Sequence, residues 1–277
     1  MDNCKEMYRD AVVTFIDILG FRDIVMNSKS DVVRRKLTAI NRFAVPRRLA
    51  YEDKEEFEPI TIQFSDSIVR IRPIDTEANQ TYPIGIVFHE LLSMVHAQGE
   101  LVKEGVLLRG GIAYGQIHYD GSVLYGPALI KAYDLESKYA VHPRIVVEPE
   151  LISALKSNQY LQSKNNSLDQ ELEYIEKLVR QNDDGIWFVD YIRAIESELD
   201  EIEMYPVFLE DHRNLIVNAA SAHPRFSTVS AKYMWLAKYH NSCIEELSDE
   251  WYEHYSLERN DLMITSDHIP VLQEMKP

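Results

Sequence analysis

Two aspartates stand where a carboxylate has no role in hydrophobic packing. Asp17 closes the apolar run 11–16, which is typical of a buried strand, and Gly20 follows before a helical pattern begins. Asp66 lies at the Ser65–Ser67 corner of a predicted hairpin. If the two strands are neighbours, both carboxylates meet at one edge of a sheet. Carboxylate oxygens suit a divalent metal ion, and the start of a helix suits a phosphate chain.

The residues beside the aspartates favour a ligand over a simple turn. The amides of Leu19, Gly20 and Phe21 would face a phosphate chain with the dipole of the next helix behind them. Glycine on one side and small serines on the other would let that chain approach closely. For either aspartate alone, a role as turn former or helix cap remains the simpler alternative.

The elements that must position these residues follow from hydrophobic periodicity. Strands are expected at 11–16, in a hairpin at 60–72, and at 107–117, 144–147 and 185–191. Helices are expected from Phe21, at 32–51, after Pro83, from Gly126 to about Ala140, up to about Arg180, and at 226–247. The order β-α-β-β-α-β with additions is the plan of ferredoxin-like α+β domains. We therefore expect a single domain over 1–277, with a core at about 8–150 and a C-terminal strand and helical elaboration at about 151–277.

Composition narrows the classes of function. The 277 residues carry a formal net charge of −16, which disfavours nucleic-acid binding because phosphate neutralisation needs a basic surface. No apolar run approaches the roughly 18 to 20 residues that span a bilayer, and residues 1–6 lack a secretory pattern. Only Cys4 and Cys243 are present, which disfavours a disulfide framework or a cysteine zinc site. We expect a cytoplasmic protein that binds neither membranes nor nucleic acid.

Three segments, in this order, resemble those of class III nucleotidyl cyclases. Residues 15–21 resemble the first metal-binding segment of the family, and residues 64–67 resemble the corner that carries its second metal aspartate. Residues 108–115 are similar to the family's arginine-bearing strand. The resemblance covers roughly residues 11–150, and it implies the palm-type, ferredoxin-like cyclase core.

The resemblance also implies a mechanism. Asp17 and Asp66, with the carbonyl of Ile18, would hold two divalent ions, Mn²⁺ or Mg²⁺. One ion would lower the pKa of the ribose 3′-hydroxyl and the other would neutralise the phosphates. The hydroxyl would attack the α-phosphorus and expel pyrophosphate. Arg109 would contact the triphosphate; its simpler alternative is a surface salt bridge at a strand end.

The chain departs from purine cyclases at four positions. Ile130 and Asp134 stand where those enzymes carry an asparagine and a transition-state arginine, and Ile62 and Val123 replace their purine-selecting lysine and aspartate. These losses fit the pyrimidine cyclases of bacterial antiphage defence, the Pycsar cyclases. Further stretches resemble that branch: 107–113, 125–133, 135–136, 143–147 and 232–241.

The branch resemblance implies a homodimer with composite sites that makes cyclic UMP or cyclic CMP, which a separate effector then reads. We favour UTP over CTP as the substrate. Two assignments stay open. Lys131, Lys138 and Arg144 are nearby in sequence as replacements for the missing arginine. Candidates for contact with the base are Gln63, Tyr51 and Tyr125.

Other functions compete with this hypothesis. The main rival is a cyclase-like module that binds a nucleotide or dimerises without catalysis, as the Ile130 and Asp134 positions suggest. Against it, a module without a metal has little reason to keep two strand-end carboxylates that repel each other. A purine cyclase with rearranged selectors is disfavoured by Ile62 and Val123, and a two-metal nuclease by the acidic charge balance.

Overall fold

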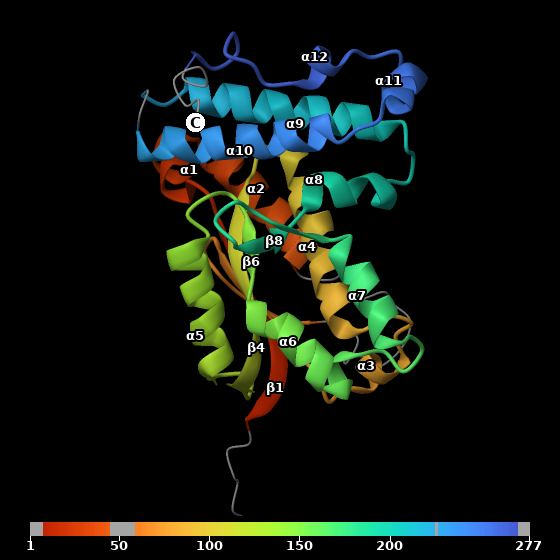
Figure 1. The fold of residues 1–277 in the computed structure, drawn as a ribbon. Coiled ribbons are helices and arrows are strands. Elements are labelled where there is room, and N and C mark those ends of the chain that lie inside the picture. Colours follow the sequence, from red (N-terminus) through yellow and green to blue (C-terminus); the bar gives the residue numbers. More distant parts are fainter. Residues whose placement is uncertain (1–7, 45–58, 225–226, 271–277) are drawn as a thin grey trace, which may run out of the picture.

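A mixed β-sheet with helices on both faces organises the chain (Figure 1). The computed structural model describes residues 8–44, 59–224 and 227–270. The strands follow the order β2 (Ile60–Phe64), β3 (Ser67–Pro73), β1 (Arg9–Ile18), β4 (Leu108–Tyr119), β6 (Ile145–Val147), β8 (Trp187–Val189) and β7 (Val179–Gln181), and β5 (Leu124–Tyr125) pairs with β4. All described pairings are antiparallel except that of β4 with β6. The predicted α+β class is confirmed.

The helices cover both faces and one end of the sheet. They are α1 (Phe21–Asn27), α2 (Ser30–Ala44), α3 (Glu77–Thr81), α4 (Ile86–Lys103), α5 (Pro127–Asp134), α6 (Pro149–Ser157), α7 (Leu168–Glu176), α8 (Tyr191–Ala194), α9 (Met204–Ser221), α10 (Thr228–Glu245), α11 (Asp249–Tyr255) and α12 (Arg259–Leu262). Helix α4 lies along one face, α5 along the other, and α9 and α10 lie across the end beside α1 (Figure 1). Among the described residues, no helix combines the length and apolar character needed to cross a bilayer.

Alternation along β1 assigns its side chains to the two faces. Val12 and Ile16 join the large core on the α4 side, whereas Val13 and Phe15 pack with the smaller cluster under α5. Because successive side chains of a strand point to opposite faces, Asp17 lies on the α5 side with Val13 and Phe15. Burial on both faces explains the nearly continuous apolar run of β1.

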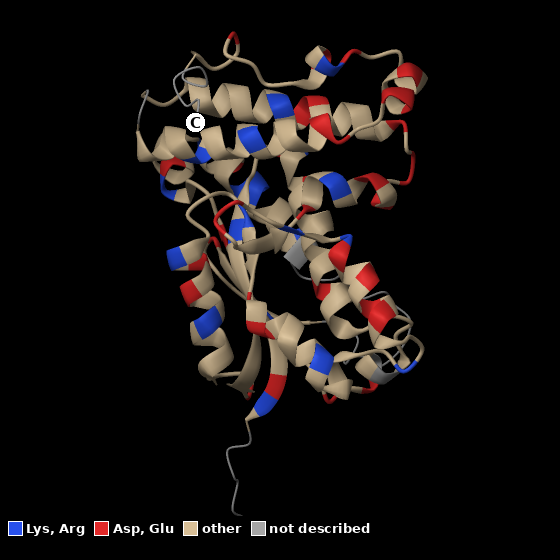
Figure 2. Cartoon of the chain, in the orientation of Figure 1, with Lys and Arg blue, Asp and Glu red and all other residues tan. Residues whose placement is uncertain are grey.

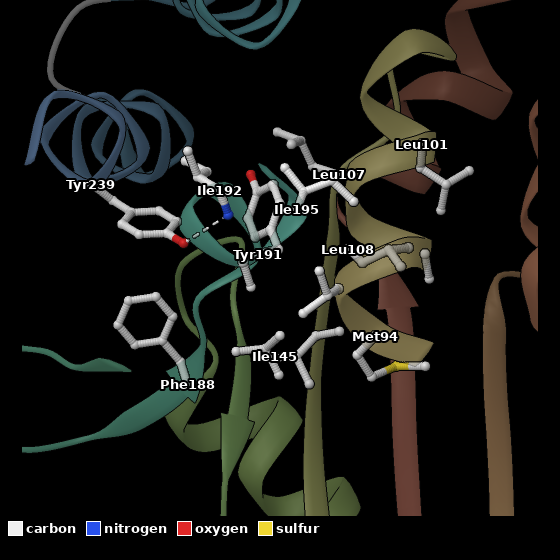
Figure 3. Packing of buried hydrophobic residues seen from close by; sticks show 14 of the residues in the cluster. Met94, Leu101, Leu107, Leu108, Ile145, Phe188, Tyr191, Ile192, Ile195 and Tyr239 are labelled. Carbon is white, nitrogen blue, oxygen red and sulfur yellow. Dashed lines mark hydrogen bonds between the residues drawn. The ribbon is translucent and has the colours of Figure 1, made fainter. Parts of the chain in front are cut away.

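The large core continues from the first strand to the C-terminal helices. It contains Ile16 near one end of the chain and Ile264 near the other. Figure 3 shows Leu108 of β4 and Phe188 of β8 within this core, together with Tyr239 of α10. The large core therefore continues past residue 150, where we expected the C-terminal elaboration to begin, and β7 and β8 extend the same sheet.

Most predicted elements are present, with one error. The charged helix expected to reach about Arg180 ends at Glu176 as α7, and Val179–Gln181 forms β7, which pairs with β8. Strand pairing prevails because Val179 is buried and Arg180 bonds to Asp190 at 2.8 Å. The expected helix at 32–51 is present as α2, but its predicted C-terminal part lies outside the described residues. The helix expected from Gly126 to about Ala140 is α5 followed by a π-helical turn, Leu135–Tyr139.

A chain of buried hydrogen bonds joins four C-terminal helices. The Tyr191 hydroxyl lies 2.6 Å from His212 Nε2, and His212 Nδ1 lies 3.1 Å from His240 Nδ1. His240 Nε2 is 3.0 Å from the Leu262 carbonyl oxygen, to which it must donate. Both imidazoles are then neutral, in keeping with burial, which lowers the pKa of His240 to about 4. These bonds fix α10 relative to α8, α9 and α12.

A buried ion cluster on the α4 side fastens the hairpin to α4. Glu90 is 1% exposed and accepts hydrogen bonds from Arg70 Nε at 2.8 Å, Arg72 Nε at 2.5 Å and the Thr14 hydroxyl at 2.8 Å. Burial alone would raise the pKa of Glu90, but the two arginines lower it to about 2. Glu90 is therefore ionised, and its charge offsets two arginines that would otherwise be buried without a counter-ion.

Glu90→Gln is expected to lower the free energy of unfolding by about 3 kcal/mol or more, because it leaves two buried guanidinium groups uncompensated. Urea denaturation followed by circular dichroism would measure the loss. Glu100→Gln on the same helix is the control, with an expected change within about 0.5 kcal/mol. Equal stabilities of the two variants would contradict the assigned role of the cluster.

Candidate active site at the end of the central strands

The pairing of β1 with β4 sets Asp17 directly opposite Arg109. The two side chains meet across the strands, with Arg109 Nη2 3.2 Å from Asp17 Oδ2. The Ser67 hydroxyl approaches the other carboxylate oxygen of Asp17 at 3.4 Å. Thus β1, β3 and β4 together position one carboxylate, one guanidinium and one hydroxyl at a single sheet edge.

Asp66 joins Asp17 from the hairpin corner. Ser65 adopts a left-handed conformation with φ of 59°, which turns the chain sharply between β2 and β3. Burial raises the pKa of Asp66, and the hydrogen bond and negative charge of Asp17 raise it further. The structure therefore brings together the two aspartates that the sequence singled out, and the two carboxylates repel each other when both are ionised.

A third acidic residue of the site, Glu136, is the second one that contacts Arg109. Gly111 makes this possible, because a Cβ atom there would lie 2.4 Å from Leu135 Cβ and 2.4 Å from the Ala132 carbonyl oxygen. The π-helical turn after α5 thus packs directly on β4 and places Glu136 Oε1 2.5 Å from Arg109 Nη2. Burial raises the pKa of Glu136, while the charge of Arg109 acts in the opposite direction. Arg109 is therefore clamped between two carboxylates.

The fifth charged residue, Lys232, comes from α10. Burial lowers the pKa of Lys232 and the neighbouring Arg109 lowers it further, whereas Glu136 and Asp17 raise it. The sequence reasoning assigned no role to Lys232 or to Glu136. The sequence signal available for both was that they lie in the stretches for which we expected the branch resemblance, 135–136 and 232–241.

The turn after β1 differs from expectation at one amide. Leu19 donates its amide to the Leu107 carbonyl oxygen at 2.9 Å, so this amide does not face a phosphate chain, as we had predicted. The pairing of β1 with β4 continues one residue further than we had predicted, and the Leu19 amide takes part in it. Gly20 turns the chain with φ of 73°, and its carbonyl accepts the amides of Asp23 and Ile24 in α1. That the amides of Gly20 and Phe21 would donate to a phosphate chain stays a prediction.

The residues proposed to contact the base are separated in the structure. Gln63 donates to the Ser65 carbonyl at 3.1 Å and accepts from Asn41 Nδ2 at 2.6 Å, so it lies beside the hairpin corner. It also lines a groove of about 660 Å³ along α1 and α2. Tyr125 pairs with His118, towards the other end of β4 from the Asp17–Arg109 pair, so the register removes it from this site. Tyr51 lies outside the described residues.

Three basic residues lie near α5 in the sequence, and each forms a described ion pair with a carboxylate outside this site. Lys131 lies 2.6 Å from Glu148. Lys138 lies 2.8 Å from Asp134, one helical turn away on the surface. Arg144 is 1% exposed and pairs with Asp184 at 2.8 Å. Each is explained by a partner elsewhere, and Ile130 is 63% exposed on the outer side of α5.

The donor set suits a hard divalent ion in kind. Two adjacent carboxylates and the carbonyl of Ile18 are oxygen ligands of the type that Mg²⁺ and Mn²⁺ prefer. Burial raises the pKa of Asp66 and the neighbouring Asp17 raises it further, so a cation bound between the two carboxylates would stabilise their ionised forms. The described residues contain no cluster of three or more His, Cys, Asp or Glu side chains that would hold a metal by themselves. Any ion here would therefore need further ligands from a substrate or water.

Comparison with protein-family models finds none that matches the chain, and comparison with curated proteins finds no match either. A function must therefore be argued from the residues and geometry of this site.

Asp17→Asn is expected to lower the pKa of Asp66, because it removes the adjacent negative charge. Carbon-13 NMR of the side-chain carboxyl group, followed through an acid titration, measures this pKa. Asp10→Asn, at the opposite end of β1, is the matched control and should leave Asp66 unchanged. Identical Asp66 titrations in all three proteins would show that the two aspartates are not coupled.

Proposed function

We propose that this chain is a metal-dependent nucleotidyl cyclase. In this reaction a pyrimidine ribonucleoside triphosphate, UTP in preference to CTP, yields its 3′,5′-cyclic monophosphate and pyrophosphate. The observation that carries the proposal is the pair Asp17 and Asp66 beside Arg109 at one sheet edge. The antiparallel order β2-β3-β1-β4, with a helix following β1 and α4 following β3, supports a ferredoxin-like, palm-type core, as in class III cyclases.

Each charged residue of the site has its own role in the proposed reaction. Asp17, Asp66 and the Ile18 carbonyl would hold Mn²⁺ or Mg²⁺, which when bound supplies charge neutralisation and acidifies the ribose 3′-hydroxyl. Arg109 would bind the phosphate oxygens and stabilise the charge that develops as pyrophosphate leaves. Glu136, at 2.5 Å, keeps the Arg109 guanidinium oriented and so acts as a positioning residue.

Three observations support a pyrimidine substrate. Ile62 and Val123 are apolar where purine cyclases carry their polar selectors. Gln63 lies next to the hairpin corner and bonds to Asn41. A primary amide offers both a donor and an acceptor, and either could pair with the edge of a pyrimidine ring. A groove formed by α1, α2 and β2 adjoins Gln63, with room for a small ring.

An apolar surface on the α5 side supports the proposed homodimer. Phe64 is 83% exposed at the end of edge strand β2. Phe64 pairs with Ser67 and Ile62 pairs with Val69, so Phe64 and Ile62 lie on the same face of the sheet. Ile130 on α5 is 63% exposed on this side of the sheet. These two exposed apolar side chains on one side of the sheet are the features on which we base the interface. Pairing two copies through this face would give composite sites, in which each copy lends residues to the other.

The proposed biological role follows from the resemblance to antiphage cyclases. The cyclic nucleotide would act in the cytoplasm as a second messenger for a separate effector, without a membrane or nucleic-acid partner. In the view of Figure 2, basic residues (blue) are interspersed with acidic ones (red) along the helices. This distribution, with the net charge of −16, disfavours a nucleic acid as the partner, so the ligand we propose is a single nucleotide.

A catalytically inactive nucleotide-binding or dimerisation module is the second candidate. Ile130 and Asp134 favour it, because α5 lacks the asparagine and arginine of purine cyclases. The coupled carboxylates oppose it, since their repulsion destabilises a fold that has no cation to bind. Activity with each nucleotide separates the two candidates.

Incubation with Mn²⁺ and each of the four ribonucleoside triphosphates is expected to give cyclic UMP as the main product, identified by mass spectrometry. Asp66→Asn should reduce the rate at least about a hundredfold, because it removes an anionic metal ligand. Asp10→Asn, on β1 but far from the site, should match the wild type. Cyclic AMP or cyclic GMP alone would contradict the pyrimidine assignment. Nucleotide binding without any cyclic product would favour the inactive module.

The wild-type chain is expected to sediment as a dimer, and Phe64→Glu should shift it toward the monomer, since a charge would be buried at the interface. Analytical ultracentrifugation measures both states. Ile202→Glu is the control, because Ile202 is also exposed, at 53%, but lies between α8 and α9. A monomeric wild type, or equal sedimentation of both variants, would contradict the proposed interface.

A further inference from the structure

Arg109 forms two ion pairs that differ in length and in burial. Glu136 Oε1 lies 2.5 Å from Arg109 Nη2, and the Glu136 side chain is only 4% exposed. Asp17 Oδ2 lies 3.2 Å from the same nitrogen, and the Asp17 and Arg109 side chains are 17% and 25% exposed. The shorter pair is shielded by Glu136, whereas the longer pair is open to solution. The Asp17 contact is therefore the weaker of the two, because water and ions compete with an exposed ion pair.

Packing fixes Glu136, so Arg109 keeps this partner when it leaves Asp17. The π-helical turn that carries Glu136 rests on β4 at Gly111, where a Cβ atom would lie 2.4 Å from Leu135 Cβ. The guanidinium would then stay at the end of β4 with its charge still paired. A guanidinium has five N–H donors, and both ion pairs use Nη2, so the other nitrogens can donate to an anion from solution.

Both carboxylate oxygens of Asp17 have a partner within the chain. Oδ2 pairs with Arg109, and Oδ1 accepts from the Ser67 hydroxyl at 3.4 Å. A divalent ion held by Asp17 would share this carboxylate with a second positive charge, the guanidinium. Two cations at one partly buried carboxylate repel each other. Arg109 and a divalent ion are therefore rivals for Asp17, unless an anion binds between the two positive charges.

We propose that the Asp17–Arg109 ion pair is an autoinhibitory contact, which disfavours divalent ions at the candidate site until a phosphate group draws Arg109 away from Asp17. Arg109 then exchanges one carboxylate for a phosphate oxygen and keeps Glu136, so its charge stays paired throughout. The inference rests on the proposed function for the metal ion and the phosphate-bearing substrate. It adds a coupling to that function, in which a metal ion and a phosphate strengthen each other's binding, because such coupling is reciprocal.

The binding of Mn²⁺ alone, measured by electron paramagnetic resonance of the free ion, tests the contact without turnover. Arg109→Met should bind Mn²⁺ about five- to a hundredfold more tightly than the wild type, which is the usual range of coupling between sites. Arg9→Met is the matched control, because Arg9 pairs with Asp75 at 2.7 Å and stands at the opposite end of β1. At that separation its charge is screened, and the Mn²⁺ affinity should stay within about twofold. Equal or weaker Mn²⁺ binding by Arg109→Met would overturn the proposal.

Sulfate provides a second measurement that needs no substitution. It is a tetrahedral dianion like a phosphate group, and it does not precipitate Mn²⁺. At an ionic strength kept constant with chloride, a large excess of sulfate should tighten Mn²⁺ binding by the wild type about fivefold or more. The same addition should leave Arg109→Met unchanged. A wild type that sulfate does not affect would overturn the exchange of partners, even if circular dichroism showed that Arg109→Met fails to fold.

The outcomes separate this inference from the proposed function. If the wild type forms a cyclic nucleotide but Arg109→Met gains no Mn²⁺ affinity, the autoinhibitory contact fails alone. If the wild type forms no cyclic nucleotide but Arg109→Met gains Mn²⁺ affinity, the cyclase fails and the contact stands. Absence of Mn²⁺ binding by both chains, with and without sulfate, overturns both.

Discussion

The antiparallel register between β1 and β4 is the constraint on which the candidate site depends. It sets Asp17 opposite Arg109, and a shift of β1 by one residue would send Asp17 to the α4 face while Arg109 stayed on the α5 face. The burial of β1 on both faces excludes such a shift, because the apolar residues of each face fit a different cluster. Packing along the whole strand therefore determines the position of the charged groups at its end.

Close packing under β4 adds the second constraint. Gly110 and Gly111 have no side chain, so Ile16 on one side and the π-helical turn on the other approach the strand at distances that a Cβ atom would prevent. That approach buries Glu136 against Arg109. The glycine-rich appearance of the strand thus has a packing reason. The same glycines let a buried carboxylate, Glu136, pair with the Arg109 guanidinium.

Local patterns in the sequence were sufficient for the first half of the site. The apolar run of β1 and the hairpin corner are encoded within about ten residues each, so Asp17 and Asp66 could be identified before the structure, whereas Arg109 was identified from the resemblance of its strand. The short strand β7 could not, because three residues carry no usable periodicity and continue a charged helical pattern. Tyr125 was a candidate by its nearness to a glycine turn, but the strand register takes it to the other end of β4. Lys232 reaches the site through long-range packing, which a single sequence does not express.

The placement of α10 has a consequence for the order in which the protein is made. A chain leaves the ribosome from its N-terminus, and its parts fold as they emerge. Asp17, Asp66 and Arg109 are therefore exposed to the cell well before α10, at 228–245, has been translated. During that interval β1 and the hairpin can pair, but the large core lacks the helices that close it over the strand ends. The complete charge cluster exists only after synthesis has passed residue 245, so translation itself delays the moment at which the centre is assembled.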